Sequence, residues 1–319
     1  MRILLTAIGK RVQLVNHLKK HNYVIGVDAG TLSPARYFVD NFYQIPFHDD
    51  RNYINTLLDI CKTEQIDMLI PLYEKEFIIL DEYRKRFNDI GTFLLLSDKS
   101  ILEICNDKWN TYNFFRTNNI NTPKTYLLED IRNNRLDINY PLILKPRDGM
   151  GSKGIFHVKG ERELSYFSSD QNNYIIQEEV KGVEYTMDVL CDLGGKILSI
   201  VPRQRLEVRA GEVVKSRSVK DFDLIDSTLD LVNKLNSKNG NSAIGPMNIQ
   251  CIVNKEKDIK FIEVNPRFGG GVPLTFESGV DYSKIFNDMV AGRNISPSIG
   301  DFRELVMLRY DEAIFREEI

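Results

Sequence analysis

The sequence predicts an α/β first domain with a doubly wound parallel sheet, followed by an α+β second domain of antiparallel sheets with helices. Two observations support this prediction. In the first hundred residues, short apolar runs alternate with amphipathic helical stretches, which is typical of parallel βαβ units. After Ser100 strands dominate and helices are few, which indicates an α+β arrangement. The change of pattern places the domain boundary near residues 97–106.

The elements of the first domain follow from apolar periodicity. We expect helices over residues 12–18 and 53–61 and over Phe77–Phe87, and strands at Arg2–Thr6, Tyr23–Asp28, Met68–Pro71 and Thr92–Leu96. Ligands of parallel sheets bind at the carboxyl ends of strands, which are here Thr6–Gly9, Asp28–Gly30 and Pro71–Glu74. Only one glycine follows the first strand, so the dinucleotide-binding fingerprint G-x-G-x-x-G is absent there.

The second domain begins with a helix predicted over Asp107–Asn118. Strands are expected at Leu142–Lys145, Ile155–Val158, Tyr174–Glu178, Tyr185–Cys191, Ile197–Val201, Asn248–Val253 and Lys260–Val264. One helix interrupts them, with Phe222, Ile225, Leu229, Val232 and Leu235 on one face and Asn239-Gly240-Asn241 at its end. The tail Glu304–Ile319 is expected to add a final strand.

Composition excludes several classes of protein. The net charge of −3 and the pI of about 5.9 speak against a dedicated nucleic-acid binder. The longest apolar runs fall far short of the roughly 20 residues of a membrane-spanning helix. Cysteines 61, 105, 191 and 251 are widely spaced, which predicts buried, reduced thiols and a cytoplasmic location. His17 and His21 lack the glutamate of a zinc-protease motif between them, so we expect surface histidines.

A glycine-rich segment follows Lys145-Pro146. Gly149, Gly151 and Gly154 match G-x-G-x-x-G, but the next residues, Ile155–Val158, alternate like a strand rather than a helix. The segment therefore predicts a loop between two antiparallel strands. Such a loop can fold over phosphates and donate backbone N–H groups, as in kinases, although the kinase motifs H-R-D and D-F-G are missing. An ordinary surface hairpin is the alternative.

A candidate metal site lies near the end of the last predicted strands. Glu263 and Asn265 are two residues apart, so both point to one face of the sheet, and Gln250 on the preceding strand could join them. Carboxylate and amide oxygens suit Mg²⁺, which takes phosphates at its other positions. A plain solvated sheet face explains this segment poorly, because Asn265 precedes Pro266 and the cluster Gly269–Gly271 follows.

Arginines in a third segment suggest an acid-binding strand. Arg203, Arg205 and Arg209 have even spacing and would share one strand face, in a flap over the site. Arginine forks bind carboxylates bidentately, so this face could hold an acidic substrate. A solvated strand edge protected by charge is the alternative.

Taken in order, these segments resemble the ATP-grasp superfamily. The order is Asp107-Lys108, Lys145-Pro146, the glycine loop, Gln177-Glu178-Glu179-Val180 with Glu184, Gln250, and Glu263-Val264-Asn265-Pro266-Arg267. The last two segments resemble one synthetase unit of the large chain of carbamoyl-phosphate synthase. The whole chain is similar to short, stand-alone ligases of that type. The resemblance implies a pre-ATP-grasp, Rossmann-like domain over residues 1–104 and an ATP-grasp domain over 105–319. The latter would hold a glycine-loop subdomain at about 122–181 and a metal-binding subdomain at about 182–300.

The resemblance also implies a role for each motif. The residues that would bind ATP are Lys108, Lys145, Gly149, Gly151, Ser152, Lys153, Gly154, Glu178, Val180 and Glu184. Gln250, Glu263 and Asn265 would hold a pair of Mg²⁺ ions, with Mn²⁺ as a substitute. Arg267, with Lys145, would act in catalysis by stabilising the transferring phosphoryl group. The segment between Val180 and Glu184 is slightly shorter than in carbamoyl-phosphate synthase.

The implied reaction joins a small-molecule carboxylate to an amine. ATP would convert the carboxylate into an acyl phosphate, and the amine would displace phosphate to give an amide. A carbamate or carboxylate kinase and a non-catalytic ATP-binding module remain alternatives. Neither nucleic acid nor membrane is expected as a partner, and a homodimer is compatible with the sequence.

Substrate residues are predicted at the domain junction. Glu74, Arg203, Arg205, Gly269 and Gly270 are the candidates. Glycines would let backbone amides approach an anionic acyl phosphate closely. Glu74 could bind an ammonium group or could cap the helix that begins near Lys75.

Overall fold

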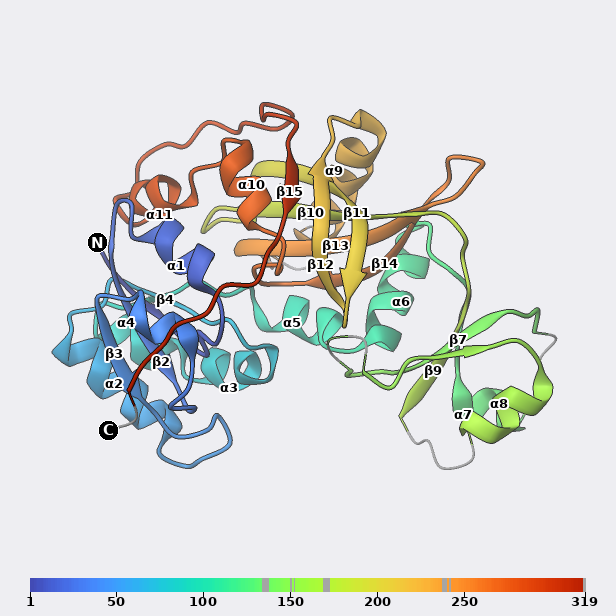
Figure 1. Ribbon diagram of the computed structural model, residues 1–319, viewed down its shortest axis with the longest axis horizontal. Helices are drawn as coiled ribbons and strands as arrows, with labels where there is room; N and C mark the ends of the chain where they lie inside the picture. Colours follow the sequence, from blue (N-terminus) through green and yellow to red (C-terminus); the bar gives the residue numbers. More distant parts are fainter. Residues whose placement is uncertain are drawn as a thin grey trace.

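The first domain is a five-stranded parallel sheet covered by helices on both faces (Figure 1). The computed structural model describes residues 1–133, 138–149, 151, 153–168, 173–236, 240 and 242–317. The strands, in the order β3-β2-β1-β4-β5, are β1 (Arg2–Leu5), β2 (Tyr23–Asp28), β3 (Asn41–Gln44), β4 (Met68–Ile70) and β5 (Phe93–Leu94). The helices are α1 (Val12–Leu18), α2 (Tyr53–Thr63), α3 (Phe77–Glu82), α4 (Arg84–Asp89) and α5 (Lys99–Cys105), with the 3-10 turns η1 (Pro34–Tyr37) and η2 (Glu74–Glu76). The predicted doubly wound parallel sheet is confirmed.

Strand β1 is apolar at successive positions because both faces of the sheet are covered. Ile3 and Leu5 belong to one buried cluster, whereas Leu4 belongs to another. Successive strand residues point to opposite faces, so each face has its own core. The cluster of Ile3 and Leu5 also contains residues of the second domain, which joins the two domains through apolar packing.

The helix predicted over Phe77–Phe87 is two helices, which break at Tyr83. The guanidinium of Arg84 donates to the carbonyls of Leu96 (3.0 Å) and Ser97 (2.9 Å) and to Asp81 (2.9 Å). These contacts tie the helix break to the chain after β5. The carbonyl of Leu96 is therefore not available for pairing with a neighbouring strand. Strand β5 is accordingly shorter than the predicted Thr92–Leu96.

A four-stranded antiparallel sheet follows in the order β6-β9-β7-β8. Its strands are β6 (Thr125–Leu127), β7 (Leu142–Pro146), β8 (Phe156–Val158) and β9 (Tyr174–Glu178), and it carries α7 (Leu128–Asn133) and α8 (Glu161–Ser168). Because β7 and β8 pair antiparallel, the glycine-rich segment connects two antiparallel strands as predicted.

A six-stranded antiparallel sheet lies between the other two sheets (Figure 1). Its strands are β10 (Val183–Cys191), β11 (Ile197–Arg209), β12 (Glu212–Ser218), β13 (Gly245–Val253), β14 (Ile259–Asn265) and β15 (Val306–Leu308). The associated helices are α6 (Lys108–Thr117), α9 (Phe222–Asn236), α10 (Pro273–Ser278) and α11 (Tyr282–Val290). The expected final strand is β15, at the sheet edge beside β12. After β15 the tail runs back across the first domain (Figure 1).

Individual side-chain predictions in the second domain have mixed outcomes. Phe222 is 62 % exposed at the first turn of α9, so its predicted place on the buried face is wrong, and Leu224 is buried instead. The segment proposed to end this helix lies partly outside the described residues. All four cysteines are free and buried, as predicted. Within the described ranges, no helix is both long and apolar enough to cross a membrane.

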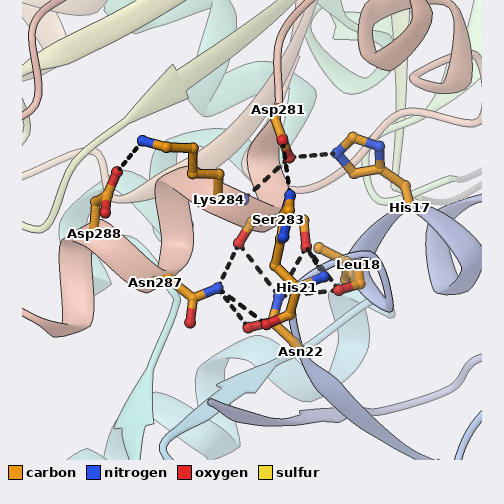
Figure 2. Close-up of polar contacts among 9 residues, drawn as sticks. All are labelled: His17, Leu18, His21, Asn22, Asp281, Ser283, Lys284, Asn287 and Asp288. Carbon is orange, nitrogen blue, oxygen red and sulfur yellow. Dashed lines mark hydrogen bonds and ion pairs between the residues drawn. The ribbon is translucent and has the colours of Figure 1, made fainter.

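Helix α11 docks on α1 through a polar cluster that joins the two domains (Figure 2). Ser283 Oγ donates to the carbonyl of Leu18 (2.8 Å), and Asn22 Nδ2 donates to Ser283 Oγ (2.9 Å). His21 Nε2 lies 3.2 Å from Asp281 Oδ2. The prediction of surface histidines is right for half-exposed His21 and wrong for His17. His17 is 4 % exposed and stacks on Phe276 at 3.8 Å between ring centroids. Its burial depends on α10, which the sequence did not reveal.

His17 is expected to make stability depend on pH. Burial lowers the pKa of His17 to about 4, aided by the nearby Lys20, while Asp281 opposes the shift. The unfolded chain binds this proton near pH 6.5, so stability contributed by neutral His17 is present above pH 6.5 and is lost as the pH falls toward 4. Between pH 7 and pH 5, the unfolding free energy of the native chain should therefore fall by about 2 kcal/mol more than that of His17→Phe. Denaturant unfolding at both values measures this, with exposed His157→Gln as the control. If the unfolding free energies of the native chain and of His17→Phe changed equally with pH, the lowered pKa of His17 would be contradicted.

Candidate active site between the domains

A central cavity of about 270 Å³ lies where the two domains meet. The first domain contributes Arg11 and Glu74, the glycine-rich hairpin contributes Gly151, and the six-stranded sheet and the turn after β14 supply the remaining lining residues. Predicted site residues that line it are Glu74, Gly151, Arg203, Arg205, Gln250, Glu263, Asn265, Arg267 and Gly270. Segments almost 200 residues apart in the sequence thus meet at one site.

The register of the six-stranded sheet places the cavity side chains opposite one another on neighbouring strands. Gln250 is opposite Glu263 and Thr186, and Thr186 is opposite Arg203. Asn265 is opposite Asn248 in the next row. Directly paired residues point to the same face, and so do residues two apart along a strand. The predicted common face of Gln250, Glu263 and Asn265 is therefore present.

Glu263 is a partly buried carboxylate, 25 % exposed at its side chain, with cations around it. Its Oε1 lies 3.5 Å from Lys108 Nζ, and Arg267 and Lys145 are further neighbours. Burial alone would raise the pKa of Glu263, but Lys108, Lys145 and Arg267 outweigh burial and lower it. Glu263 is therefore an anion at neutral pH. Among the described residues, no cluster of three His, Cys, Asp or Glu side chains could hold a metal ion, so a metal here would depend on amide oxygens as well.

Lys145 and Lys108 approach Glu263 from the four-stranded sheet and from the start of α6. Lys145 is 6 % exposed, and its Nζ donates to Gln177 Oε1 at 2.8 Å. Burial lowers the pKa of Lys145 to about 8, although Glu263 acts in the opposite direction. Lys108 Nζ donates to the carbonyl of Gly149 (2.7 Å), which ties α6 to the glycine-rich loop. Asp107 caps α6 by accepting from the Trp109 N–H at 2.7 Å.

Arg267 pairs with Glu74 across the domain junction. Arg267 Nε donates to Glu74 Oε1 at 2.6 Å, and its Nη1 donates to the carbonyl of Phe268 at 3.1 Å. Glu74 is the first residue of η2, but the capping contact there comes from Glu76, which accepts from the Tyr73 N–H at 3.0 Å. The structure thus gives the capping role to Glu76 and places Glu74 in the cavity.

Removing the Glu74 carboxylate should slow turnover with little cost in stability. Glu74→Ala frees the Arg267 fork, so we expect the maximal rate to fall about tenfold while the KM for ATP changes little and the melting temperature falls modestly, because the pair is partly buried. Steady-state kinetics and thermal melting measure both, and exposed Lys75→Ala in the same turn is the control. A loss of stability of about 1 kcal/mol with unchanged kinetics would instead support a helix cap.

Arg203 is committed to a buried ion pair. It is 2 % exposed, and its Nε and Nη2 donate to the two oxygens of Asp188 at 2.7 and 2.9 Å. Asn248 and Thr275 also donate to Asp188. Among the residues that the structure describes, Arg203 Nη1 has no hydrogen-bond partner. Most of the arginine fork predicted to face an acid substrate is therefore occupied within the protein.

The glycines after Phe268 pack tightly against this network. A Cβ on Gly269 would lie 2.2 Å from Asn248 Nδ2, and one on Gly271 would lie 2.2 Å from Arg203 Nη1. Because Asp188 holds both of these side chains, they cannot move aside without breaking buried hydrogen bonds, and glycine is favoured at both positions. Gly270 has ordinary space and lines the cavity.

Arg203, Arg205 and Arg209, which were predicted to share one strand face, differ in exposure and in contact with the cavity. The pairing of β11 with β12 shifts register between Arg205 and Glu207 and again at Val208, but the two shifts offset one another: Arg205 is opposite Ser216 and Arg209 is opposite Glu212, four residues apart on each strand. Arg209 is 74 % exposed and pairs with Glu207, whereas Arg205 lines the cavity 3.3 Å from Glu184 Oε2.

The glycine-rich loop reaches the cavity at Gly151. Gly151 and Gly154 have φ angles of +63° and +73°, which favour glycine, and Gly149 has no room for a Cβ beside Pro146. Lys153 is exposed. Ser152, the other predicted phosphate contact of this loop, lies outside the described residues.

A side chain at Gly151 should impair ATP use. Gly151→Val forbids the positive φ and blocks close approach of the backbone, so we expect the KM for ATP to rise about tenfold and phosphoryl transfer to slow. ATP titrations of initial rate measure this, and Gly160→Val, with open space and ordinary φ, is the control. Normal ATP kinetics would mark the loop as an ordinary hairpin.

The residues predicted for adenosine lie at the end of β9 and the start of β10. Glu178 accepts from Lys260 Nζ at 3.4 Å and from the Lys124 N–H at 3.3 Å. Val180 follows it in the connection to β10. Glu184 is 54 % exposed at its side chain. These residues are neighbours on the chain and lie outside the lining of the central cavity, as do Lys108 and Lys145.

Several residues at the cavity were missed in the sequence, among them Arg11 and Asn248, which line it, and Asp188 behind them. Arg11 follows β1, and its Nη1 donates to the carbonyl of Phe268 at 3.2 Å. Burial lowers the pKa of Arg11 to about 10, and neighbouring Arg267 adds to the shift. Asp188 and Asn248 form the network behind Arg203. The position of Asn248 two residues before Gln250 was a usable signal, but nothing local marks Arg11.

A parallel α/β domain is joined here to two antiparallel sheets around a polar cavity, which is the architecture expected from the resemblance to ATP-grasp proteins. Residues 3–95 match the family model described as PylC-like, N-terminal domain. Residues 105–271, more than half of the chain, match the model described as ATP-grasp domain. The chain therefore belongs to the ATP-grasp family.

Relatives are similar over only part of their length. The carbamoyl phosphate synthase arginine-specific large chain of Halalkalibacterium halodurans is 25 % identical over 238 residues, which cover 69 % of this chain and 22 % of that one. The carbamoyl phosphate synthase large chain of Campylobacter jejuni is 20 % identical over 255 residues, or 74 % of this chain and 23 % of the relative. The chain thus spans about a quarter of these relatives.

Solved structures agree on the fold. An N5-carboxyaminoimidazole synthetase from Staphylococcus aureus, complexed with ADP, superposes with a TM-score of 0.78 at 16 % identity and covers 97 % of this chain and 82 % of its own. An L-amino acid ligase from Bacillus licheniformis gives a TM-score of 0.70 at 16 % identity, covering 95 % and 77 %. At such identities the likeness shows the fold alone.

Proposed function

We propose that this protein is an ATP-dependent carboxylate–amine ligase that forms an acyl phosphate and releases ADP and phosphate. One observation carries the proposal: Gln250, Glu263, Asn265 and Arg267 meet on one cavity wall, with Lys108 3.5 Å from Glu263. This is a set of oxygen donors beside positioned cations, which is what phosphoryl transfer from ATP requires.

The nucleotide would lie between the two antiparallel sheets. Lys108 and Lys145 would bind its phosphates, and Gly149, Gly151, Lys153 and Gly154 would cover them through the loop, with Ser152. Glu178 and Val180 would meet the adenine edge, and Glu184 the ribose. The ion pair of Glu184 with Arg205 leaves more than half of the Glu184 side chain exposed, so its carboxylate is accessible to hydroxyl groups.

Magnesium fits the donors that the sheet presents. Gln250, Glu263 and Asn265 offer one carboxylate and two amides on neighbouring strands, and hard oxygen ligands are what Mg²⁺ prefers. A pair of ions, with Mn²⁺ as a substitute, is part of the proposal. Bound Mg²⁺ would supply Lewis-acid stabilisation of the phosphates. Arg267, held by Glu74, would stabilise charge on the transferring phosphoryl group.

The substrates would bind where the two domains meet at the central cavity. Glu74 of the first domain and Arg203, Arg205 and Gly270 of the second line it there, and Gly269 packs against Asn248. We place the domain boundary at residues 104/105, with a glycine-loop subdomain at about 122–181 and a metal-binding subdomain at about 182–300. We also propose that the protein is cytoplasmic and that it forms a homodimer.

A carbamate or carboxylate kinase is the second candidate. It is favoured by the similarity to large chains named carbamoyl phosphate synthase, of which this chain spans about a quarter. Such an enzyme would release the acyl phosphate without forming an amide. A non-catalytic ATP-binding module is the third, and the partly buried, anionic Glu263 among its cations speaks against it.

An ADP-release screen over a matrix of carboxylates and amines tests the proposal. We expect turnover that requires one carboxylate and one amine, with an amide detected by mass spectrometry. ADP release with the carboxylate alone, and no amide, would favour the kinase. ATP binding without turnover for any pair would favour the module.

A further inference from the structure

A second cavity, of about 280 Å³, opens at the carboxyl edge of the parallel sheet in the first domain. The loops that follow β1, β2, β3 and β4 all contribute to this strand-edge cavity. Its described lining residues do not overlap with those of the central cavity, yet one short turn borders both. Glu74 of η2 faces the central cavity, whereas Glu76 of η2 and the preceding Tyr73 face this one. In open α/β sheets, ligands bind at this edge.

Aromatic side chains line the walls of the strand-edge cavity, and hydrogen bonds hold the residue at its base. Phe47 is 69 % exposed at the cavity, and the ring of His48 meets Tyr73 edge-on at 5.4 Å between centroids. The floor is Glu76, 2 % exposed, which accepts from Thr6 Oγ1 (2.6 Å), from the Tyr73 N–H (3.0 Å) and from the hydroxyl of Tyr53. An exposed phenylalanine beside a preformed cavity provides apolar surface for a ligand to cover.

The charge of the cavity has one sign. Asp28 and Glu76 line it, and its described lining includes no lysine or arginine. Burial raises the pKa of Glu76, so Asp28 is the more available anion. Asp28 Oδ2 accepts from the Gly9 N–H and Oδ1 from the Gly30 N–H, both at 2.9 Å. Each oxygen keeps a further lone pair for a ligand. The contact to Gly9 also occupies an N–H that a dinucleotide phosphate would need.

We propose that the strand-edge cavity binds a small organic cation, an ammonium group on an apolar or aromatic body, and that this ligand is the amine substrate. A carboxylate attracts the ammonium group, and aromatic rings attract it through their faces while they cover the apolar body. The position next to η2 brings such a ligand beside the central cavity. The assignment as amine substrate rests on the proposed ligase function, whereas the preference for a cation does not.

Two probes of similar size and opposite charge test the cavity. 2-Phenylethylammonium and 3-phenylpropanoate are titrated into the full chain without ATP, by calorimetry and by NMR of the four histidine rings. His48→Gln assigns the His48 signal. We expect the cation to bind and to shift His48, and the anion to bind at least about tenfold more weakly. Phe47→Ala should weaken the cation about fivefold. Phe222→Ala, a similarly exposed phenylalanine on α9, should leave binding unchanged.

Equal binding of the two probes, an unmoved His48 signal, or full affinity in Phe47→Ala would each overturn the proposal. Asp28→Asn should remove the preference for the cation, and if that variant is unstable, the Phe47→Ala result decides. In the ligase assay, Phe47→Ala should raise the KM for the amine and leave the KM for ATP unchanged. Turnover with an unchanged amine KM would refute the substrate assignment and leave the ligase standing. Cation binding without any turnover would refute the ligase and leave the cation site standing.

Discussion

Glu263→Gln is expected to lower the rate of ADP formation on the order of 10²-fold, while the protein stays folded. Glu263 is the one carboxylate in the proposed magnesium set, and Lys108, Lys145 and Arg267 hold it in its anionic form. Glutamine keeps the shape of the side chain but removes the charge that the metal and the two lysines require. Initial rates measured across a magnesium titration give the loss, and thermal melting reports on the fold.

Glu256→Gln is the matched control for this substitution. Glu256 is exposed in the turn between β13 and β14, on the same hairpin as Glu263 but away from the cavity. Its activity should equal that of the native chain. Unchanged activity of Glu263→Gln at saturating magnesium would remove Glu263 from the site and, with it, the central observation behind the proposed function.

Asp188→Ala is expected to cost about 3–5 kcal/mol of unfolding free energy. Asp188 accepts both bonds of the Arg203 fork, and neither side chain is more than 3 % exposed. Removing the carboxylate leaves a buried guanidinium without its counter-ion, which is far more costly than losing a surface pair. Urea denaturation measures the change in unfolding free energy.

Asp230→Ala provides the comparison at the surface. Its partner Lys234 is four residues away on α9, and Asp230 is 59 % exposed, so the expected cost is about 0.5 kcal/mol. Adding Arg203→Met to Asp188→Ala should recover part of the lost stability, because the uncompensated charge is then gone. A cost of Asp188→Ala no larger than that of Asp230→Ala would show that the pair contributes no more than an exposed one.

Local pattern was sufficient for much of the fold. Strand β1 could be read from Arg2–Leu5 because an apolar run bounded by polar residues is the local requirement of a strand buried on both faces. Short or half-exposed elements were missed. Strand β3 pairs with β2 although its residues are at most partly buried. Helices α10 and α11 were missed although Pro273 at the start of α10 and the capping Asp281 before α11 mark where they begin.

In the candidate site, too, features that depend on neighbouring segments could be predicted and features that depend on distant segments could not. Gln250, Glu263 and Asn265 could be placed together because strand period and antiparallel pairing follow from neighbouring segments. The partner of Arg267 could not be predicted, since Glu74 lies 193 residues earlier and reaches it only when the domains close. The different exposure of the two arginines was equally hidden: Arg205 lines the cavity while Arg209 is 74 % exposed near the end of β11, and no local feature marks that difference.

By itself, the sequence determined the doubly wound sheet, the antiparallel hairpin with its glycine loop, and the shared face of the metal candidates. Each depends on periodicity or spacing within one or two segments, and these are properties that the chain carries locally. Only the tertiary structure decided that Arg203 is bound to Asp188, that Glu74 holds Arg267, and that His17 is buried. The reason is physical: burial and ion pairing depend on which distant surfaces exclude water from one another, and that is settled only when the domains pack.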